Sequence, residues 1–335
     1  MKYNDINFNK KTILITGGAG FIGSNLAFYF QKNYPKAKVL VLDCFRTGET
    51  FSNGNLKSFG HFKNLLGFKG VVISGDINDK KLLKNLEKNY KFDYIFHQAA
   101  ISDTTVSEQD LIIKTNVNAY EDLLKIAIKH KANIIYASSA ATYGNSDKFE
   151  VGCEKPNNAY GFSKVMMDNI TAEYLKKDLE ISIVGLKYFN VYGPREFFKN
   201  KTASMVVQFG HQILKGLTPK LFEGSDKILR DFIYIEDVIQ ANIKASNPKK
   251  SGVYNVGTGC ARSFEDIVNI LQNELEINNG KEYMPNPYVG SYQFFTEANI
   301  ETTKKYLDYE PRFSMEDGIK AYIPEIKRLF QEEVK

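Results

Sequence analysis

The segment that decides the fold is Thr16-Gly17-Gly18-Ala19-Gly20-Phe21-Ile22-Gly23, which follows an apolar run and precedes a stretch with helical apolar spacing. Its three spaced glycines allow a tight turn, a close approach of the backbone to a phosphate, and close packing of helix on strand. The N-terminus of the following helix adds N–H donors and the positive end of its dipole. The segment therefore predicts a dinucleotide site in which Gly17, Gly20, Phe21, Ile22 and Gly23 contact the pyrophosphate.

Short β-branched runs recur on both sides of this turn and are separated by stretches with helical apolar spacing, such as residues 24–32 and 119–130. The runs lie at residues 12–15, 39–42, 71–74, 94–97, 134–137 and 181–186. Such alternation is typical of parallel strands joined by crossover helices. We therefore expect an α/β fold built on a doubly wound, Rossmann-type parallel sheet.

The rhythm changes after Pro194 to longer, less regular stretches with scattered aromatic residues. This change predicts a dinucleotide-binding domain over residues 1–190 and a smaller, mainly substrate-binding lobe over residues 191–335. A strand and helix near residues 230–265 are expected to return to the first domain. The strand at Gly252 to Val256 is the candidate for joining the main sheet.

The bulk composition is ordinary for a globular chain. Hydrophobic residues make up 43% of the 335 residues, and the formal charge of +5 is spread along the sequence, so neither nucleic acid nor a membrane surface is expected as a partner. Cys44, Cys153 and Cys260 lie far apart and the histidines are isolated, which predicts neither disulfides nor a metal site. The polar N-terminus and the absence of a long apolar run indicate a cytoplasmic protein.

Three further segments are expected to border the dinucleotide site because each ends a predicted strand. Asp43 lies about 20 residues beyond the last glycine, where an acidic side chain holds a ribose hydroxyl. Gly75-Asp76-Ile77 follows the third strand, and its carboxylate can accept from the adenine amino group. His97-Gln98-Ala99-Ala100 follows the fourth, and its small residues let a cofactor lie against the backbone.

Tyr160 and Lys164 are four residues apart, so both project from one face if this stretch is helical. An ammonium beside a phenol favours the phenolate and lowers the pKa of the tyrosine, which makes it a usable base near neutral pH. Ser139, at the end of the fifth predicted strand, would hydrogen-bond a substrate hydroxyl and orient it toward the tyrosine. Together these residues predict hydride transfer between an alcohol and a nicotinamide.

On these motifs the chain resembles the extended short-chain dehydrogenase/reductase family, the group of nucleotide-sugar epimerases and dehydratases. The resemblance covers nearly the whole chain and rests on residues 16–23, Ser138-Ser139, residues 160–164 and Tyr188-Phe189-Asn190-Val191-Tyr192-Gly193-Pro194-Arg195. It implies a tightly bound nicotinamide cofactor, one per subunit, a nucleotide-sugar substrate, and self-association of the chain into a homo-oligomer.

Within that family, residues 137–144, 195–205, 221–225 and 230–232 are similar to epimerases that act on C6 of an ADP-activated heptose. The resemblance implies redox-neutral inversion through a transient ketone, in the supply of heptose for the lipopolysaccharide inner core. Inversion requires a base on each face of the carbonyl carbon. Tyr160 matches one of them and Lys199 matches the other, with Lys201 as the alternative.

The resemblance also implies the remaining binding residues. For the cofactor they are Cys44, Arg46, Asn116 and Val191, and for the substrate Asn190, Lys201, Gln208, Phe222, Glu223, Gly224, Ser225, Arg230 and Tyr292, besides Ser139. Arg230 suits a diphosphate because a guanidinium forms bidentate bonds with it. We expect NADP, the family's cofactor, although Asp43 alone would favour NAD by repelling a 2′-phosphate. Arg46 could supply the compensating cation, since Thr50 stands where enterobacterial members have a lysine and residues 46–70 form a longer segment.

Three other functions compete with this prediction. A 4,6-dehydratase needs an acidic pair directly after residue 139, and Ala140 and Ala141 cannot act as acid or base. A 4-epimerase, or a dehydrogenase on another nucleotide-activated heptose or hexose, would keep the serine, tyrosine and lysine and differ mainly around residues 195–205. A non-catalytic dinucleotide-binding module would have no reason to keep those three side chains together.

Overall fold

The computed structural model describes residues 2–286 and 294–334, and its main sheet confirms the expected Rossmann-type α/β fold. Seven strands pair in parallel in the order β10-β6-β5-β4-β1-β2-β3. They are β1 (Thr12–Thr16), β2 (Lys38–Asp43), β3 (Val71–Ser74), β4 (Tyr94–His97), β5 (Asn133–Ser139), β6 (Ile183–Tyr188) and β10 (Gly252–Val256). The strand order reverses between β1 and β4, which is where such sheets bind ligands.

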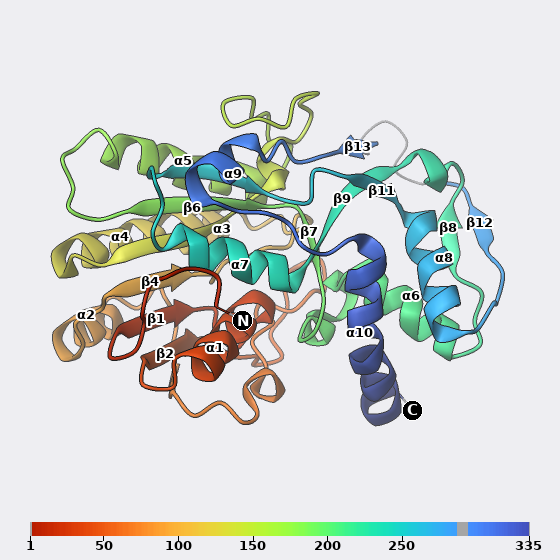
Figure 1. Ribbon diagram of the computed structural model, residues 1–335, viewed down its shortest axis with the longest axis horizontal. Coiled ribbons are helices and arrows are strands. Elements are labelled where there is room, and N and C mark those ends of the chain that lie inside the picture. The colour runs from red at the N-terminus through yellow and green to blue at the C-terminus, as the bar shows by residue number, and fades with distance from the viewer. Residues whose placement is uncertain (1, 287–293, 335) are drawn as a thin grey trace.

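Helices cover both faces of this sheet (Figure 1). On one face lie α1 (Phe21–Asn33), α7 (Ile235–Ala245) and α9 (Glu301–Leu307), and on the other α2 (Lys80–Asn89), α4 (Ala119–His130) and α5 (Ala159–Tyr174). In α4, Tyr120, Leu123, Leu124 and Ala127 are fully buried, as the helical apolar spacing of this stretch predicts. The short α3 (Gln109–Ile112) and the π-helical turn η2 (Ile113–Asn118) precede α4.

The second lobe lies beside the carboxyl ends of the strands, on the right of Figure 1. Its helices are α6 (Met205–Leu214), α8 (Phe264–Leu275) and α10 (Met315–Leu329), and its strands are β7 (Asn190–Tyr192), β8 (Lys220–Phe222), β9 (Leu229–Tyr234), β11 (Ala261–Ser263), β12 (Glu282–Met284) and β13 (Phe295–Thr296). Strand β9 pairs with β7, β11 and β13, and β8 pairs with β12.

The chain passes between the lobes several times. After β9 it enters α7, which packs against α1, and strand β10 then pairs with β6 at the edge of the main sheet. Helix α9 later packs on β10. Three elements from the second half of the chain therefore complete the first lobe.

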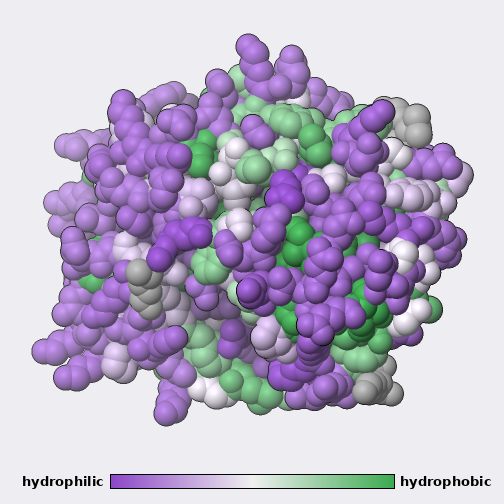
Figure 2. Space-filling model, turned by 45° about the vertical axis from the view of Figure 1, so that its right-hand side comes forward, coloured by the Kyte–Doolittle hydropathy of each residue, from purple (hydrophilic) through white to green (hydrophobic). Residues whose placement is uncertain are grey.

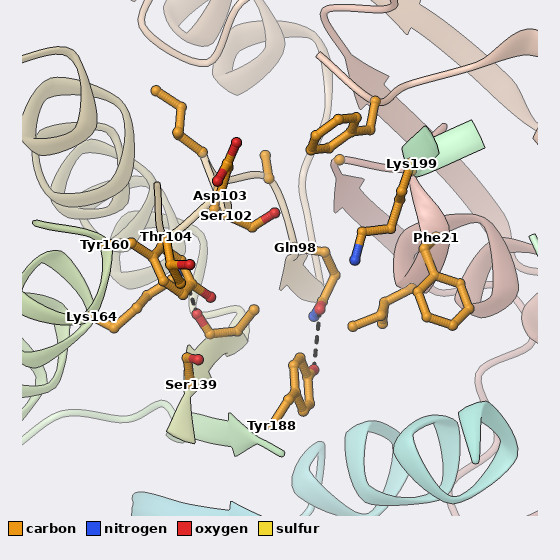
Figure 3. Close-up of a pocket in the computed structure, with 18 of the residues that line it drawn as sticks. Phe21, Gln98, Ser102, Asp103, Thr104, Ser139, Tyr160, Lys164, Tyr188 and Lys199 are labelled. Atoms are coloured by element: carbon orange, nitrogen blue, oxygen red, sulfur yellow. Dashed lines mark hydrogen bonds between the residues drawn. The ribbon is translucent and has the colours of Figure 1, made fainter. Parts of the chain in front are cut away.

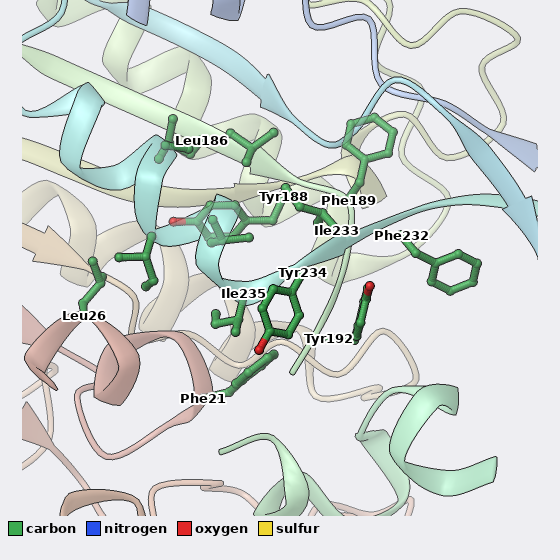
Figure 4. Close-up of a cluster of buried hydrophobic side chains, with 14 of the residues drawn as sticks. Phe21, Leu26, Leu186, Tyr188, Phe189, Tyr192, Phe232, Ile233, Tyr234 and Ile235 are labelled. Atoms are coloured by element: carbon green, nitrogen blue, oxygen red, sulfur yellow. The ribbon is translucent and has the colours of Figure 1, made fainter. Parts of the chain in front are cut away.

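A continuous apolar core joins the two lobes. Figure 4 shows side chains of β6, β7, β9 and α1 in one cluster, among them Leu186, Tyr192, Ile233 and Leu26. All four are buried, so a displacement of the lobes would expose apolar surface at a cost of about 25 cal/mol per Å². This packing fixes the geometry of the cavity that lies between the lobes.

The surface over the second lobe is mostly hydrophilic, with scattered apolar side chains (Figure 2). Within residues 2–286 and 294–334, no helix combines the length and the hydropathy needed to cross a bilayer. Over the same residues, no three His, Cys, Asp or Glu side chains gather closely enough to hold a metal ion.

Candidate active site

A cavity of about 610 Å³ opens at the carboxyl ends of the central strands, between the two lobes. Figure 3 shows side chains of both lobes converging on it. Most of the expected site residues line it, namely Gly17, Gly20, Phe21, Ile22, Gly23, Asp43, Cys44, Asp76, Ile77, Gln98, Ala99, Ala100, Ser139, Tyr160, Lys164, Asn190, Val191, Lys199 and Arg230.

The glycine turn forms one end of this cavity and packs tightly on its neighbours. Gly17 has a φ of +67°, and a Cβ there would lie 2.7 Å from the backbone nitrogen of Ala99. A Cβ on Gly23 would lie 2.2 Å from the Gly17 carbonyl oxygen, so any side chain at either position would force the turn apart. Helix α1 begins here without a side-chain cap, which leaves its first N–H groups for an anion.

Asp43 lies at the end of β2, where a ribose hydroxyl is expected, but its carboxylate also has protein partners. It accepts hydrogen bonds from the backbone N–H groups of Ala19 (2.9 Å) and Phe45 (3.0 Å). Burial raises the pKa of this carboxyl, and the backbone hydrogen bonds oppose that rise. Asp43 therefore fastens the glycine turn to β2 in addition to facing the cavity.

Arg46, expected beside a 2′-phosphate, does not line the cavity, and its guanidinium donates to the Phe198 carbonyl. The loop after β2 folds back on itself, because the N–H of Lys57 donates to the Glu49 carbonyl at 2.9 Å. This fold returns Lys57 and Ser58 to the cavity wall. Sequence reasoning missed both residues, since spacing along the chain does not show where a long loop turns back.

Tyr160 and Lys164 lie near the start of α5, where Asn158 caps the helix by accepting from the Gly161 N–H at 2.8 Å. The Lys164 ammonium lies 5.8 Å from the centroid of the Tyr160 ring and donates to the Ala137 carbonyl at 2.7 Å. Ser139 lines the same cavity, and its side chain acts on the pKa of the phenol. The structure thus brings together the three side chains that the sequence predicts.

Burial decides how these groups ionise. It raises the pKa of the Tyr160 phenol, and the Ser139 side chain lowers that pKa without reversing the shift. It lowers the pKa of Lys164 to about 8, against the opposite effect of the Asp168 carboxylate. The lowered phenol pKa that the Tyr–Lys spacing predicts is therefore not the net effect, because the loss of hydration outweighs the stabilising contacts.

Asp168 connects α5 to two strands behind the catalytic side chains, a role that sequence reasoning missed. Its carboxylate accepts from the hydroxyls of Tyr136 (2.8 Å) and Ser138 (2.9 Å) and from the ammonium of Lys187 (2.7 Å). These bonds set the position of α5 against β5 and β6. A signal was present in the sequence, since Asp168 lies one helical turn beyond Lys164 and on the same face.

Lys199 enters the cavity from the side opposite Tyr160 (Figure 3). It lies on the short helix η4 (Phe197–Thr202), and its ammonium is 6.0 Å from the centroid of the Phe21 ring. Burial lowers the pKa of Lys199, and the carboxylates of Glu196 and Asp103 raise it less. Lys201 is exposed and does not line the cavity, so Lys199 is the one of the two that faces it.

The structure gathers only part of the expected substrate and cofactor set at the cavity. The expected residues that do not line the cavity are Arg46, Asn116, Lys201, Gln208, Phe222, Glu223, Gly224 and Ser225. Tyr292, also expected at the site, lies outside the described residues. Gln208 donates to the Ala203 carbonyl at 2.6 Å. Asn116 is fully buried and bonds the backbone of Ile101 and the hydroxyl of Ser163, so it supports the cavity wall from behind.

Several cavity residues were not expected from the sequence. Tyr188 lines the wall and donates to the Gln98 side chain at 3.1 Å (Figure 3). The others belong to two loops of the first lobe, namely Phe51, Leu56, Lys57, Ser58, Phe59 and Gly60 after β2, and Ile101, Ser102, Asp103 and Thr104 after β4, where Ser102, Asp103 and Thr104 lie near Tyr160 in Figure 3. Phe51 packs with Ile101 in a small buried cluster, a contact between loops that no local pattern indicates.

The sequence and the fold are similar to those of known proteins. A relative from Brachyspira hyodysenteriae, an ADP-L-glycero-D-manno-heptose-6-epimerase, is 36% identical over 319 residues, which cover 92% of this chain and 96% of the relative. The crystal structure of the Helicobacter pylori ADP-L-glycero-D-manno-heptose-6-epimerase is 52% identical, covers 98% of this chain and 99% of its own, and has a TM-score of 0.87. A UDP-glucose 4-epimerase from Thermotoga maritima, solved with UDP-glucose, is 27% identical, covers 96% of this chain and 100% of its own, and has a TM-score of 0.83.

A family model matches more than half of the chain. Residues 13–257 fit the model described as the NAD dependent epimerase/dehydratase family. This span begins at the second residue of β1 and ends just after β10, so it contains nearly all of the main sheet together with Ser139, Tyr160, Lys164 and Lys199. The chain belongs to the NAD-dependent epimerase/dehydratase family.

Proposed function

We propose that the chain converts ADP-D-glycero-D-manno-heptose into ADP-L-glycero-D-manno-heptose by inversion at C6, for the heptose of the lipopolysaccharide inner core. The observation that carries this proposal is the placement of Tyr160 and Lys199 on opposite sides of one cavity (Figure 3). Inversion requires a proton donor or acceptor on each face of the reacting carbon. The names of the two heptose-nucleotide relatives support the choice of substrate.

In the proposed mechanism, Tyr160 reacts from its minor phenolate form, since burial raises its pKa, and accepts the proton of the substrate's 6-hydroxyl while the Ser139 hydroxyl holds that oxygen in place. The Lys164 ammonium stabilises the phenolate. When bound, a nicotinamide dinucleotide supplies reversible hydride transfer at C6. Once the ketone presents its other face, the Lys199 ammonium gives a proton to the carbonyl oxygen from the opposite side. Exchange with solvent removes the proton from Tyr160 and restores the one lost by Lys199 before the next turnover, and the net reaction consumes neither oxidant nor reductant.

The direct test is to incubate the purified protein with ADP-D-glycero-D-manno-heptose, with no cofactor added, and to follow the sugar by proton NMR. We expect conversion to the L-glycero epimer without net formation of reduced cofactor, because a retained dinucleotide returns the hydride that it takes. An unchanged heptose, with reaction on a different nucleotide sugar, would overturn the substrate and leave the family assignment intact.

We further propose that the retained cofactor is NADP, that Lys57 contacts its 2′-phosphate, and that residues 1–190 hold it while residues 191–335 mainly bind the sugar nucleotide. Of the described cationic residues that line the cavity, Lys164 and Lys199 lie at the catalytic end and Arg230 on the second lobe. Lys57 belongs to the loop after β2, on the adenosine side, where the carboxylates of Asp43 and Asp76 also lie. The Lys57 ammonium pairs with the Glu49 carboxylate at 3.1 Å, and exchange of that partner for a phosphate would offset the repulsion from the two aspartates. We also propose a homo-oligomer, for which the exposed Phe162 on α5 offers apolar surface.

Replacing Lys57 by alanine is expected to weaken NADP binding about tenfold, the loss of about 1.4 kcal/mol of a partly exposed charge-assisted contact. NAD binding should be unchanged, because NAD carries no 2′-phosphate. The measurement is a fluorescence titration of cofactor-stripped protein with each dinucleotide, with Lys69→Ala as a surface control. Equal losses for NADP and NAD would show that Lys57 does not recognise the 2′-phosphate.

A further inference from the structure

The segment that carries Lys199 is a short turn between β7 and α6. It comprises residues 196–204, called here the Lys199 turn, and the side chains of its helix η4 are half-buried or exposed. Asn200 interrupts that helix with a φ of +53° and a ψ of −125°, a conformation that an exposed turn does not hold without help. A catalytic base must nevertheless stay within about 0.5 Å of its working position. Within the turn, the Lys199 N–H donates to the Glu196 carbonyl and the Thr202 hydroxyl donates to the Lys199 carbonyl, both at 2.9 Å, and contacts from outside add to these local bonds.

Glu196 holds the two ends of the Lys199 turn together from the inside. Its fully buried carboxylate accepts from the Gly193 N–H at 3.1 Å and from both the N–H and the hydroxyl of Ser204 at 2.7 Å. These bonds close the base of the turn. They do not reach its middle, where Lys199 lies.

The middle of the turn is held from the outside by two residues of the loop after β2. The Arg46 guanidinium donates to the carbonyl of Phe198, the residue before Lys199. The His61 ring stacks on the Phe198 ring with centroids 3.9 Å apart and planes 3° apart. Both contacts reach the residue next to the proposed base and neither reaches the cavity.

Arg46 and His61 are themselves well anchored. The Arg46 N–H donates to the Gly60 carbonyl at 2.9 Å, which ties the two ends of the loop together. The His61 N–H donates to the Ala19 carbonyl at 3.1 Å, inside the glycine turn. Phe198 is thus connected through two short paths to the most tightly packed part of the first lobe.

We propose that Arg46 and His61 are positioning residues for Lys199, which hold Phe198 and thereby keep the amine of the second base directed into the cavity. They act through Phe198 and touch neither substrate nor cofactor. The proposal rests on the proposed role of Lys199 as the second base. It assigns to Arg46 a role different from the phosphate contact expected from the sequence.

The test compares His61→Ala, His61→Phe and Arg46→Gln with the parent protein. His61→Ala removes the stacked ring, and we expect kcat for C6 epimerisation to fall about 10- to 100-fold, as for a base displaced by about 1 Å. KM for the sugar nucleotide and the affinity for NADP, measured by fluorescence, should stay within about twofold, because the binding residues are untouched. His61→Phe keeps an aromatic ring and should restore kcat. Arg46→Gln keeps an N–H donor and should lose less than Arg46→Met.

The pH dependence of kcat gives an independent readout. A turn that loosens lets water reach the Lys199 amine, so the burial that lowers its pKa is partly lost. The part of the pH profile of kcat that reflects ionisation of Lys199 should then shift to higher pH in His61→Ala. In His61→Phe it should lie at the same pH as in the parent protein. A role confined to stability would lower the melting temperature and leave this part of the profile in place.

Lys199→Met separates the possible failures. If Lys199→Met is inactive while His61→Ala and Arg46→Met keep the parent kcat, the positioning proposal is overturned and the second base stands. If Lys199→Met itself epimerises normally, the role of Lys199 is wrong and the positioning proposal fails with it. A loss of kcat in His61→Ala that comes with an equal rise in KM and no recovery in His61→Phe also overturns the proposal.

Discussion

Replacing Tyr160 by phenylalanine is expected to lower kcat for epimerisation by about 10³- to 10⁴-fold, near the upper range for loss of a positioned acid–base group. The phenol belongs to the cavity lining together with Ser139 and Lys164, and phenylalanine removes its hydroxyl with little change in shape. NMR of the sugar after long incubation measures the residual rate. The second tyrosine of the described lining, Tyr188, donates its hydroxyl to the Gln98 side chain at 3.1 Å.

The Tyr160→Phe protein should still retain its dinucleotide, because the glycine turn and the strand-end residues that bind it are unchanged. Denaturing the purified variant and quantifying the released nucleotide checks this. Tyr174→Phe is a matched control at the far end of the same helix, where the phenol contacts Lys177; its activity should equal that of the parent. Activity of Tyr160→Phe within about tenfold of the parent would remove Tyr160 from the mechanism.

Replacing Lys199 by methionine is expected to lower the rate of epimerisation by about 10²- to 10³-fold. Methionine keeps most of the side-chain volume, so the change removes the amine and preserves the packing against Phe21. The variant keeps Tyr160, Ser139 and Lys164 and should still oxidise the substrate on their face. Single-turnover absorbance of the reduced nicotinamide would therefore appear while the inverted product does not.

Lys201→Met is the matched control for this experiment, because Lys201 lies two residues away and is exposed outside the cavity. It should epimerise at the parent rate. The opposite pattern, with Lys201→Met inactive and Lys199→Met active, would exchange the two lysines and require the turn to rearrange when substrate binds. If Lys199→Met also failed to oxidise the substrate, Lys199 would not act on one face of the reacting carbon alone, and its proposed role would be contradicted.

Sequence reasoning worked best where a function depends on neighbours in the chain. The glycine turn needs only its own spacing, and the shared face of Tyr160 and Lys164 needs only helical geometry. The strands were also predicted from short runs of residues. In the structure they pair in a seven-stranded sheet with a cavity at the carboxyl ends of its strands. The placement of Asp43 at the end of β2 was expected, but its bonds to the N–H groups of Ala19 and Phe45 depend on how the glycine turn packs beside it.

Contacts between residues far apart in the sequence explain where the structure places site residues differently from the sequence-based expectation. Arg46 bonds Phe198, 152 residues away, instead of lining the cavity, and a folded-back loop brings Lys57 to the wall. Asn116 lies behind the wall because Ile101 and Ser163 bond its amide from two separate segments. The spacing of apolar residues within each of these segments does not predict such contacts.

The sequence by itself determined the α/β class, the dinucleotide turn and the Ser139, Tyr160 and Lys164 set, because strand period, helix period and glycine conformation act over a few residues. Only the tertiary structure decided that Lys199 and not Lys201 faces the cavity, and that Arg46 reaches the turn beside it. The direction of a loop side chain is set by whichever distant elements pack around it, and those contacts exist only once the two lobes share one core.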